Sequence, residues 1–329
     1  MRKVSVVTPC FNGARFLAET TRSVQAQTLT DWEHIVVDDG STDASADLAL
    51  ALAAAEPRML VVRQAKRGVA AARNRGVHAA SPESAYLLFL DADDCLEPTM
   101  LEELVSYLDE RPHVGLAYCV PQYTREDGSP IATGVGPGQH FLVPRYVPTR
   151  LGLTTVPSCE PETSFVSIFC QAALLPSLAV IRRTVYEDSG GWDESFGQPF
   201  EDTDLFLRIA LRTTVHRLDR RLVRYRRHSV QATADTRRFA QQERKLYETW
   251  KSKSGLRPHE RAVVDAADRF RQERLMPYVG LAAARRYLAR GEFTRAAQFC
   301  TGAVRRYVLG LISISSSGAV GAHRSIAGT

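Results

Sequence analysis

The sequence lacks several features that would point to other classes of protein. Its 329 residues include six cysteines but no C-x-x-C pair, so we expect neither a zinc site nor disulfides, and we interpret the cysteines as reduced in a cytoplasmic protein. No apolar run reaches the roughly 18 residues needed to span a bilayer, and no signal peptide precedes the first strand pattern. The net charge is only +5, which gives no argument for a nucleic-acid partner.

The signature of a dinucleotide-binding domain is also missing. The first apolar run, Val4 to Thr8, predicts a strand that Pro9 ends. No G-x-G-x-x-G follows it, although that motif would have to stand there.

Strands and single helices alternate over residues 1–120. Apolar or β-branched runs predict strands at 4–8, 33–37, 59–63, 86–90 and 114–120, and amphipathic segments predict the helices between them. This alternation is typical of an α/β fold with a Rossmann-like, mainly parallel sheet flanked by helices. Ligands of such sheets bind at the carboxyl ends of the strands.

Carboxylates gather where the fourth predicted strand ends. Asp91, Asp93 and Asp94 follow it directly. Burying several carboxylates together is costly unless a cation neutralises them. Mn²⁺ and Mg²⁺ prefer carboxylate and phosphate oxygens. We therefore predict a divalent metal and a phosphorylated ligand here, with Asp94 either part of the site or only a turn residue.

The pattern becomes weaker after residue 121 and changes again after residue 235. Glycines and prolines in 123–161 predict a hairpin and long loops, and short strands are predicted at 215–218 and 222–225. Helices are predicted near 237–252, 258–275, 277–290 and 292–309. We predict a catalytic domain at 1–235, a C-terminal α-helical extension at 236–312 and a disordered tail at 313–329.

Six motifs in order carry a resemblance to a known family. They are VSVVTPCFNG at 4–13, IVVDDGSTD at 35–43, RGVAAARNRGVHAA through FLDADD at 67–94, SGGWDE at 189–194, FEDTDLFLRI at 200–209 and YRRH at 225–228. Together they resemble a family 2 glycosyltransferase with the GT-A fold, that is, a nucleotide-diphospho-sugar transferase. The resemblance covers about residues 3–230 and implies a nucleotide-sugar-binding half at 1–120 and an acceptor half at 121–235.

The resemblance also implies roles for single residues on the donor side. Metal ligation falls to Asp93 and His228, with Mn²⁺ or Mg²⁺ bridging the donor diphosphate. Nucleotide contacts fall to Thr8, Pro9, Asn12, Asp39, Arg73 and Asp91. Two of these assignments have an ordinary structural alternative, because His228 could be a packed or surface histidine and Arg73 part of a solvated helix face.

On the acceptor side, the resemblance implies that Asp202 is the catalytic base. An inverting transfer needs one carboxylate to take the proton of the acceptor hydroxyl. Gly191, Trp192 and Glu201 are implied in the acceptor or donor-sugar pocket. The alternatives are that Glu201 and Asp202 only cap a helix, and that Trp192 is a core residue. We interpret Asp204 as a capping residue.

The function implied is transfer of a sugar from a nucleoside-diphosphate sugar, UDP-sugar being favoured, to a hydroxyl of a saccharide or lipid-linked acceptor in cell-surface polysaccharide synthesis. One alternative is an inactive nucleotide-sugar-binding protein, and another is a phosphatase of the haloacid dehalogenase type with Asp91 as nucleophile. The arginine-rich helices after 235 suggest peripheral contact with the inner face of the plasma membrane, or instead a solvated appendage or a homodimer contact.

Overall fold

The computed structural model describes residues 3–131, 145–149, 152–156, 162–169, 174–228 and 236–272, together with the single positions 288, 293 and 297. The chain divides into two compact units. The first comprises residues 1–145 and 157–252, and the second comprises residues 146–156 and 253–329.

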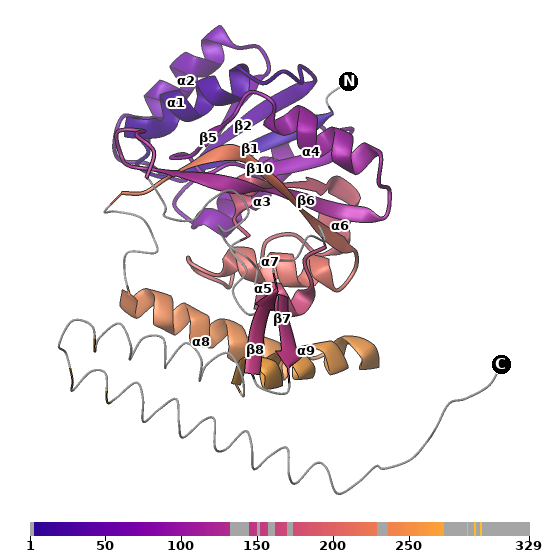
Figure 1. Ribbon diagram of the computed structural model, residues 1–329. Coiled ribbons are helices and arrows are strands. Elements are labelled where there is room, and N and C mark those ends of the chain that lie inside the picture. Colours follow the sequence, from indigo (N-terminus) through magenta and orange to yellow (C-terminus); the bar gives the residue numbers. More distant parts are fainter. Residues whose placement is uncertain are drawn as a thin grey trace, which may run out of the picture. The chain divides into compact units, whose positions relative to one another are not determined.

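The first unit is built on an eight-stranded sheet with the strand order β3-β2-β1-β4-β9-β6-β10-β5 (Figure 1). In chain order the strands are β1 (Val4–Cys10), β2 (Trp32–Asp38), β3 (Met59–Arg63), β4 (Tyr86–Phe89), β5 (Cys95–Leu96), β6 (Val114–Thr124), β9 (Ala179–Arg182) and β10 (Thr214–Arg226). The sheet is mixed, because β9 runs antiparallel to both β4 and β6, and β5 runs antiparallel to β10. Strands β2 and β3 lie on one side of β1 and β4 on the other. The carboxyl ends of β1 and β4 therefore flank a topological switch point, where open α/β sheets bind ligands.

Helices cover both faces of this sheet. The helices of this unit are α1 (Ala14–Gln25), α2 (Ser45–Ala55), α3 (Val69–Ala79), α4 (Met100–Asp109), α5 (Phe165–Phe169), α6 (Arg183–Asp188), α7 (Glu201–Ala210) and α8 (Thr236–Ser252), with a 3₁₀ turn at Pro176–Leu178. Right-handed crossovers place α1 and α2 on one face and α3 on the other (Figure 1). Gly76 lets α3 approach β1 closely, because a Cβ there would lie 2.3 Å from Val7 Cγ1.

The predicted strands of residues 1–120 are all present, and the mixed α/β class is confirmed. Two details differ from the sequence prediction. Strand β1 does not stop before Pro9 but continues to Cys10, with Pro9 opposite Val37 of β2. The two short strands predicted at 215–218 and 222–225 are one strand, β10, because irregular pairing with β6 lets the chain continue through 219–221.

Helix α8 groups with the first unit, whereas the predicted catalytic domain ended before it. The hydroxyl of Tyr247 in α8 donates a hydrogen bond to the carbonyl oxygen of Phe169 in α5 at 2.9 Å. Two aromatic contacts accompany it, Phe169–Tyr247 and Phe165–Trp250. These buried side chains explain why α8 packs with its neighbours in this unit.

In the second unit, the structure describes a two-stranded sheet of β7 (Arg145–Thr149) and β8 (Gly152–Val156) and the helix α9 (Pro258–Phe270). Helix α9 begins with Pro258, whose missing N–H costs nothing at a helix start, and the amide of Arg257 donates to Glu260 at 2.8 Å. The helices predicted at 277–290 and 292–309 and the tail at 313–329 lie outside the described residues. None of the helices in the described part of the chain is long and apolar enough to cross a membrane.

Candidate active site

The site begins at the carboxyl end of β4, where three acids follow the buried strand. The side chains of Asp91 and Asp93 are about one third exposed, at 30% and 29%, whereas Asp94 is buried. Burial, together with the neighbouring Asp93 and Asp91, raises the pKa of Asp94 well above its usual range. The partly exposed carboxylates of Asp91 and Asp93 are therefore accessible to a ligand, whereas the carboxylate of Asp94 is part of the protein interior.

Asp93 meets His228 at the end of β10. The Oδ2 atom of Asp93 and the Nε2 atom of His228 are 2.7 Å apart, although 135 residues separate them. The His228 ring also lies against Phe16, with 5.3 Å between the ring centroids. The fold thus brings together the two residues that the resemblance implied as metal ligands.

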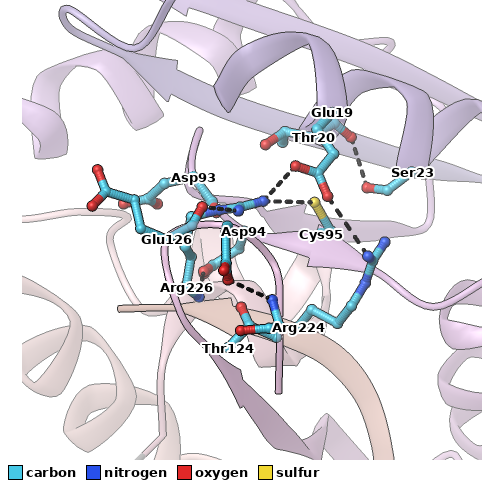
Figure 2. A network of polar contacts seen from close by, with 12 residues as sticks. Glu19, Thr20, Ser23, Asp93, Asp94, Cys95, Thr124, Glu126, Arg224 and Arg226 are labelled. Atoms are coloured by element: carbon cyan, nitrogen blue, oxygen red, sulfur yellow. Dashed lines mark hydrogen bonds and ion pairs between the residues drawn. The ribbon is translucent and has the colours of Figure 1, made fainter. Parts of the chain in front are cut away.

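Arg226 holds the acid turn against β10, as Figure 2 shows. Its Nε donates to the carbonyl oxygen of Asp93 at 3.0 Å, and its backbone amide donates to the Asp94 carboxylate at 3.1 Å. Its Nη2 pairs with Glu19 of α1 at 2.5 Å, and its guanidinium lies over Phe16 at 4.8 Å from the ring centroid. Arg226 therefore fixes the separation between Asp93 and His228. Asp94 serves this scaffold.

Arg73 of α3 lies at the centre of a second cluster. Its side chain is 1% exposed, so it is not a solvated helix face. Nη2 donates to Asp91 at 2.7 Å and Nη1 donates to Glu201 at 3.0 Å. The guanidinium also lies over the Trp192 ring, 4.3 Å from its centroid, a favourable cation–π contact. One buried cation therefore connects Asp91, after β4, to Glu201, at the start of α7.

Glu201 and Asp202 begin helix α7, where the helix dipole favours anions. The preceding Phe200 has φ +92°, a strained conformation for a residue with a side chain. Burial raises the pKa of Asp202 to about 7, and the neighbouring Glu201 adds to the rise while Arg73 opposes it. Burial also raises the pKa of Glu201, against the attraction of Arg73. A carboxyl group with a pKa near 7 is suited to exchange protons at neutral pH.

The turn that carries Trp192 is held by Asn74 of α3. The Asn74 amide nitrogen donates to the Trp192 carbonyl at 2.9 Å, and its oxygen accepts from the Trp192 amide at 3.0 Å and from Tyr186 Oη at 2.8 Å. Gly191 has φ +68°, and a Cβ there would meet Tyr186 Oη at 3.1 Å and Asn74 Oδ1 at 3.2 Å. Trp192 itself is buried and lies edge-on to Phe89 of β4, with 5.0 Å between centroids.

Asp39, at the end of β2, organises the loop before α3. Its carboxylate accepts hydrogen bonds from the Gln64 side chain and from the backbone amides of Arg67 and Gly68, each at 2.8 Å. The acid is buried. Its carboxylate holds the 64–68 loop at the edge of the predicted nucleotide site, and direct contact with a base stays a prediction.

The other predicted nucleotide residues lie at the end of β1. Thr8 is fully buried and its hydroxyl lies 2.9 Å from His34 Nε2, while Pro9 is buried in the strand. Asn12 is exposed, has φ +53°, and accepts a hydrogen bond from the Thr42 amide at 2.9 Å, which joins the two loops. Nucleotide contact by these three residues stays a prediction.

Phe11 was not among the predicted site residues, although it lies beside them. Its ring is 41% exposed, and Lys66 Nζ lies 3.2 Å from the ring centroid. An exposed aromatic face next to a cation is a suitable platform for a planar base. An aromatic residue directly after the Pro9-Cys10 strand end was the signal in the sequence.

The donor set at the acid turn fits a divalent cation in part. Asp93 supplies a carboxylate and His228 an imidazole, and the His228 Nδ1 atom has no hydrogen-bond partner within the described part of the chain. Among the residues that the structure describes, no group of three or more His, Cys, Asp or Glu side chains lies close enough together to hold a metal ion by itself. Two protein ligands suit Mg²⁺ or Mn²⁺ when phosphate oxygens and waters complete the coordination.

Some of the predicted residues form two clusters, one of Asp93 and His228 and one of Arg73, Asp91 and Glu201 with Trp192 and Asp202. The predicted residues Thr8, Pro9, Asn12 and Asp39 lie outside these clusters, at the ends of β1 and β2. Sequence reasoning missed the scaffold around them. Arg226 enters the sequence analysis only as part of the YRRH motif, and Asp204 only as a capping residue. Asp204 is instead buried and pairs with Arg208 at 2.8 Å. Only the folded chain could reveal these partners.

Comparisons with known proteins show what the chain is similar to in sequence and in fold. Residues 5–153 match the family model described as Glycosyl transferase family 2. The glycosyltransferase YibD of Escherichia coli is 38% identical over 104 residues, 32% of this chain and 30% of that protein. TuaG of Bacillus subtilis, named as a teichuronic acid biosynthesis glycosyltransferase, is 34% identical over 131 residues, 39% of this chain and 50% of that protein. The matched segments thus span half or less of these relatives.

Two solved structures resemble the chain over most of its length. A mannosyltransferase of Pyrobaculum calidifontis in complex with GDP-Man and Mn²⁺ has a TM-score of 0.61 at 20% identity, covering 97% of this chain and 80% of that one. TarS 1–349 of S. aureus in complex with UDP-GlcNAc has a TM-score of 0.60 at 17% identity, covering 96% and 92%. The likeness to these two structures shows that the chain has the GT-A fold. Within that fold, the chain is similar to the family 2 glycosyltransferases over residues 5–153.

Proposed function

We propose that this chain is a metal-dependent, inverting glycosyltransferase that moves a sugar from a nucleoside-diphosphate sugar to an acceptor hydroxyl. The observation that carries the proposal is the acid pair at the start of α7. Burial raises the pKa of Asp202 to about 7, and Arg73 connects its neighbour Glu201 to Asp91. Asp202 then lies at one end of a buried charge network and Asp91, on the proposed donor side, at the other. A displacement at an anomeric carbon by a hydroxyl requires a base such as Asp202.

Asp202 is the proposed base. Its carboxylate takes the proton of the attacking hydroxyl while the bond from the anomeric carbon to the diphosphate breaks. Only one carboxylate is needed, because a nucleoside diphosphate leaves without protonation, unlike the sugar that leaves in glycoside hydrolysis. Glu201, Gly191 and Trp192 are proposed to shape the sugar pocket, and the cation of Arg73 keeps Asp91 and Glu201 in place.

The diphosphate is proposed to bind beside Asp93 and His228. These two residues would hold Mn²⁺ or Mg²⁺, and the metal, when bound, supplies Lewis-acid stabilisation of the leaving diphosphate. Thr8, Pro9, Asn12, Asp39 and Asp91 are proposed to define the nucleotide side of the site, with Phe11 as the stacking platform.

The donor and the acceptor are assigned by analogy. The solved neighbours carry UDP-GlcNAc and GDP-Man, and we propose a UDP-sugar as donor. The name of the TuaG relative refers to teichuronic acid biosynthesis, which supports a saccharide or lipid-linked acceptor and a role in cell-surface polysaccharide synthesis. We place this activity in the cytoplasm. The phosphatase alternative is disfavoured, because Arg73 occupies Oδ1 of Asp91, the proposed nucleophile.

The proposal is tested by a transfer assay on the purified chain. We expect turnover from a UDP-sugar with Mn²⁺ or Mg²⁺ and its loss on chelation with EDTA. Asp202→Asn should lower kcat by about 10² to 10⁴-fold, with UDP affinity unchanged. Asp47→Asn, a change at an exposed acid in α2, is the matched control and should keep full activity. Turnover that persists in Asp202→Asn, or that needs no metal, would contradict the proposal.

A further inference from the structure

Helix α8, which follows the segment that matches the family model, presents one apolar face to the acceptor half. Leu246 and Trp250 are fully buried, and Tyr247 is nearly so. These residues recur at helical spacing on one side of α8, as expected for a helix that packs on a core. The contacts of this face lead towards the acid pair of α7.

Trp250 reaches the first turn of α7 directly. Its indole Nε1 donates to Asp204 Oδ1 at 3.0 Å, and Asp204 is 1% exposed. The other oxygen of Asp204 accepts from Arg208 Nε at 2.8 Å. The Asp204 carboxylate is thus held from two sides, by Trp250 and by Arg208. It stands two residues after Asp202, in the same helical turn.

Arg208 passes this contact on to the Trp192 turn. Its Nη1 donates to the carbonyl oxygen of Gly191 at 2.6 Å and also to that of Ser189. Gly191 precedes Trp192, whose ring lies against Arg73. The path from Trp250 to the buried cation is therefore continuous: hydrogen bonds join Trp250, Asp204, Arg208 and Gly191, the backbone joins Gly191 to Trp192, and a ring contact joins Trp192 to Arg73.

A second contact from α8 supports the residue just before the acid pair. Phe239 lies 4.8 Å from Phe200, ring centroid to ring centroid. Phe200 has φ +92°, and such a backbone persists only where its surroundings determine it. Lys245 of α8 also donates to the carbonyl oxygen of Ser195, in the segment that leads to Phe200.

We propose that α8 positions the acid pair Glu201–Asp202, and that Asp204, held by Trp250, is the positioning residue through which it acts. This inference depends on the proposed function for Asp202 as the base. Helix α8 is then a working part of the acceptor half.

The test uses the full chain with Trp250→Phe, Asp204→Asn and the double variant. Trp250→Phe keeps a buried aromatic ring but removes the indole N–H that donates to Asp204, together with some buried ring volume. We expect kcat to fall by about tenfold to about a hundredfold, since small misplacements of a catalytic group have effects of this size, while UDP affinity changes by less than about twofold. The lower limb of the kcat/KM pH profile should move, because the surroundings of Asp202 change. The double variant should lose no more than the worse single variant, because both act through one contact.

Arg244→Ala is the matched control on α8. Arg244 is 80% exposed and pairs along the helix surface with Glu248, so its loss should leave kcat and the pH profile unchanged. If Trp250→Phe lowers thermal stability but leaves kcat and the pH profile as in the wild type, α8 is merely structural and the inference is wrong.

Hydrogen exchange separates this inference from the proposed function. In Trp250→Phe, amide exchange should quicken at 195–204 and stay unchanged at 86–94. That readout needs no turnover. A wild type without transferase activity would overturn the proposed function. The exchange data would still decide whether α8 orders the acid pair Glu201–Asp202. Unchanged exchange at 195–204 would overturn the inference even in an active enzyme.

Discussion

At the scale of single residues, the site contains more negative than positive charge. Arg73 bonds directly to both Asp91 and Glu201, and Asp202 stands beside them. Burial raises the pKa of all three acids above their usual range. Strained or destabilised charges of this kind are found where function requires them, and they lower stability.

Removing the charge of Asp202 should therefore stabilise the protein while it abolishes transfer. The pKa of Asp202 is raised to about 7, so the folded protein binds this proton more tightly than the unfolded chain. The wild type then loses stability as pH rises from about 4 to about 7. We expect the free energy of unfolding of Asp202→Asn to exceed that of the wild type by roughly 1–3 kcal/mol at pH 8, with the difference disappearing near pH 4. Urea unfolding at both pH values measures this, and a variant less stable at pH 8 would contradict it.

Arg73→Lys tests the connection that Arg73 makes between Asp91 and Glu201. Lysine keeps the charge but cannot reach two carboxylates with a planar fork. One acid would be left buried without its partner, which costs roughly 3–5 kcal/mol when a buried pair is broken. We expect a lower melting temperature and a fall in kcat. Arg75→Lys, two residues further along the same helix, is the control and should change neither the melting temperature nor kcat. A wild-type kcat in Arg73→Lys would exclude the connecting role.

At the scale of elements, tight turns deliver the site residues. The 189–194 turn places Trp192 over Arg73, and the carboxyl ends of β4 and β10 place Asp93 beside His228. Helix α3 contributes to both sides, because Arg73 holds the acids and Asn74 holds the turn. The geometry of the site depends on how these elements approach one another.

Gly191→Ala tests the turn. The backbone at Gly191 has φ +68°, and the added Cβ would meet Tyr186 Oη and Asn74 Oδ1 at 3.1 and 3.2 Å. The left-handed backbone alone costs about 1–2 kcal/mol for a residue with a side chain. We expect loss of stability by at least this amount and weaker transfer, measured by thermal unfolding and kcat. Gly255→Ala is the matched control, because Gly255 has φ +76° but nothing within 4 Å of an added Cβ; it should lose stability and keep activity. Equal effects of the two variants on kcat would contradict the role of the turn.

At the scale of the whole molecule, charge suggests how the chain meets a surface. The chain has 42 Lys and Arg against 37 Asp and Glu, and exposed basic residues stand on α8 and before α9, including Arg244 and Arg257. We propose that this C-terminal part contacts anionic lipid. Basic residues near such a surface each add about 1 kcal/mol of attraction, which salt screens.

Vesicle co-sedimentation checks this proposal. The full chain should pellet with phosphatidylserine-containing vesicles and not with pure phosphatidylcholine vesicles, and added salt should release it. Charge-reversed Arg244→Glu should weaken the pelleting. Equal recovery with both kinds of vesicle would exclude an electrostatic membrane contact and leave the homodimer or solvated-appendage interpretations.

The sequence alone determined the elements and the candidate acids. Local periodicity predicted the strands of residues 1–120 to within a few residues, because hydrophobic patterning is a property of neighbouring positions. Acids directly after a buried strand marked the carboxyl edge of the sheet. The prediction that Pro9 ends the strand was wrong. Whether the missing N–H of a proline interrupts a strand depends on the neighbouring strand, and the local sequence pattern carries no information about that neighbour.

Only the tertiary structure decided which charges become partners. Arg73 and Glu201 are 128 residues apart, and Asp204 was interpreted as a cap until the fold placed it between Arg208 and Trp250. Buried polar groups must find partners wherever the chain brings them together, and that meeting is set by packing between distant elements. For the same reason, the sequence predicted a domain boundary before α8 from composition, whereas the buried aromatic face of α8 packs within the first compact unit.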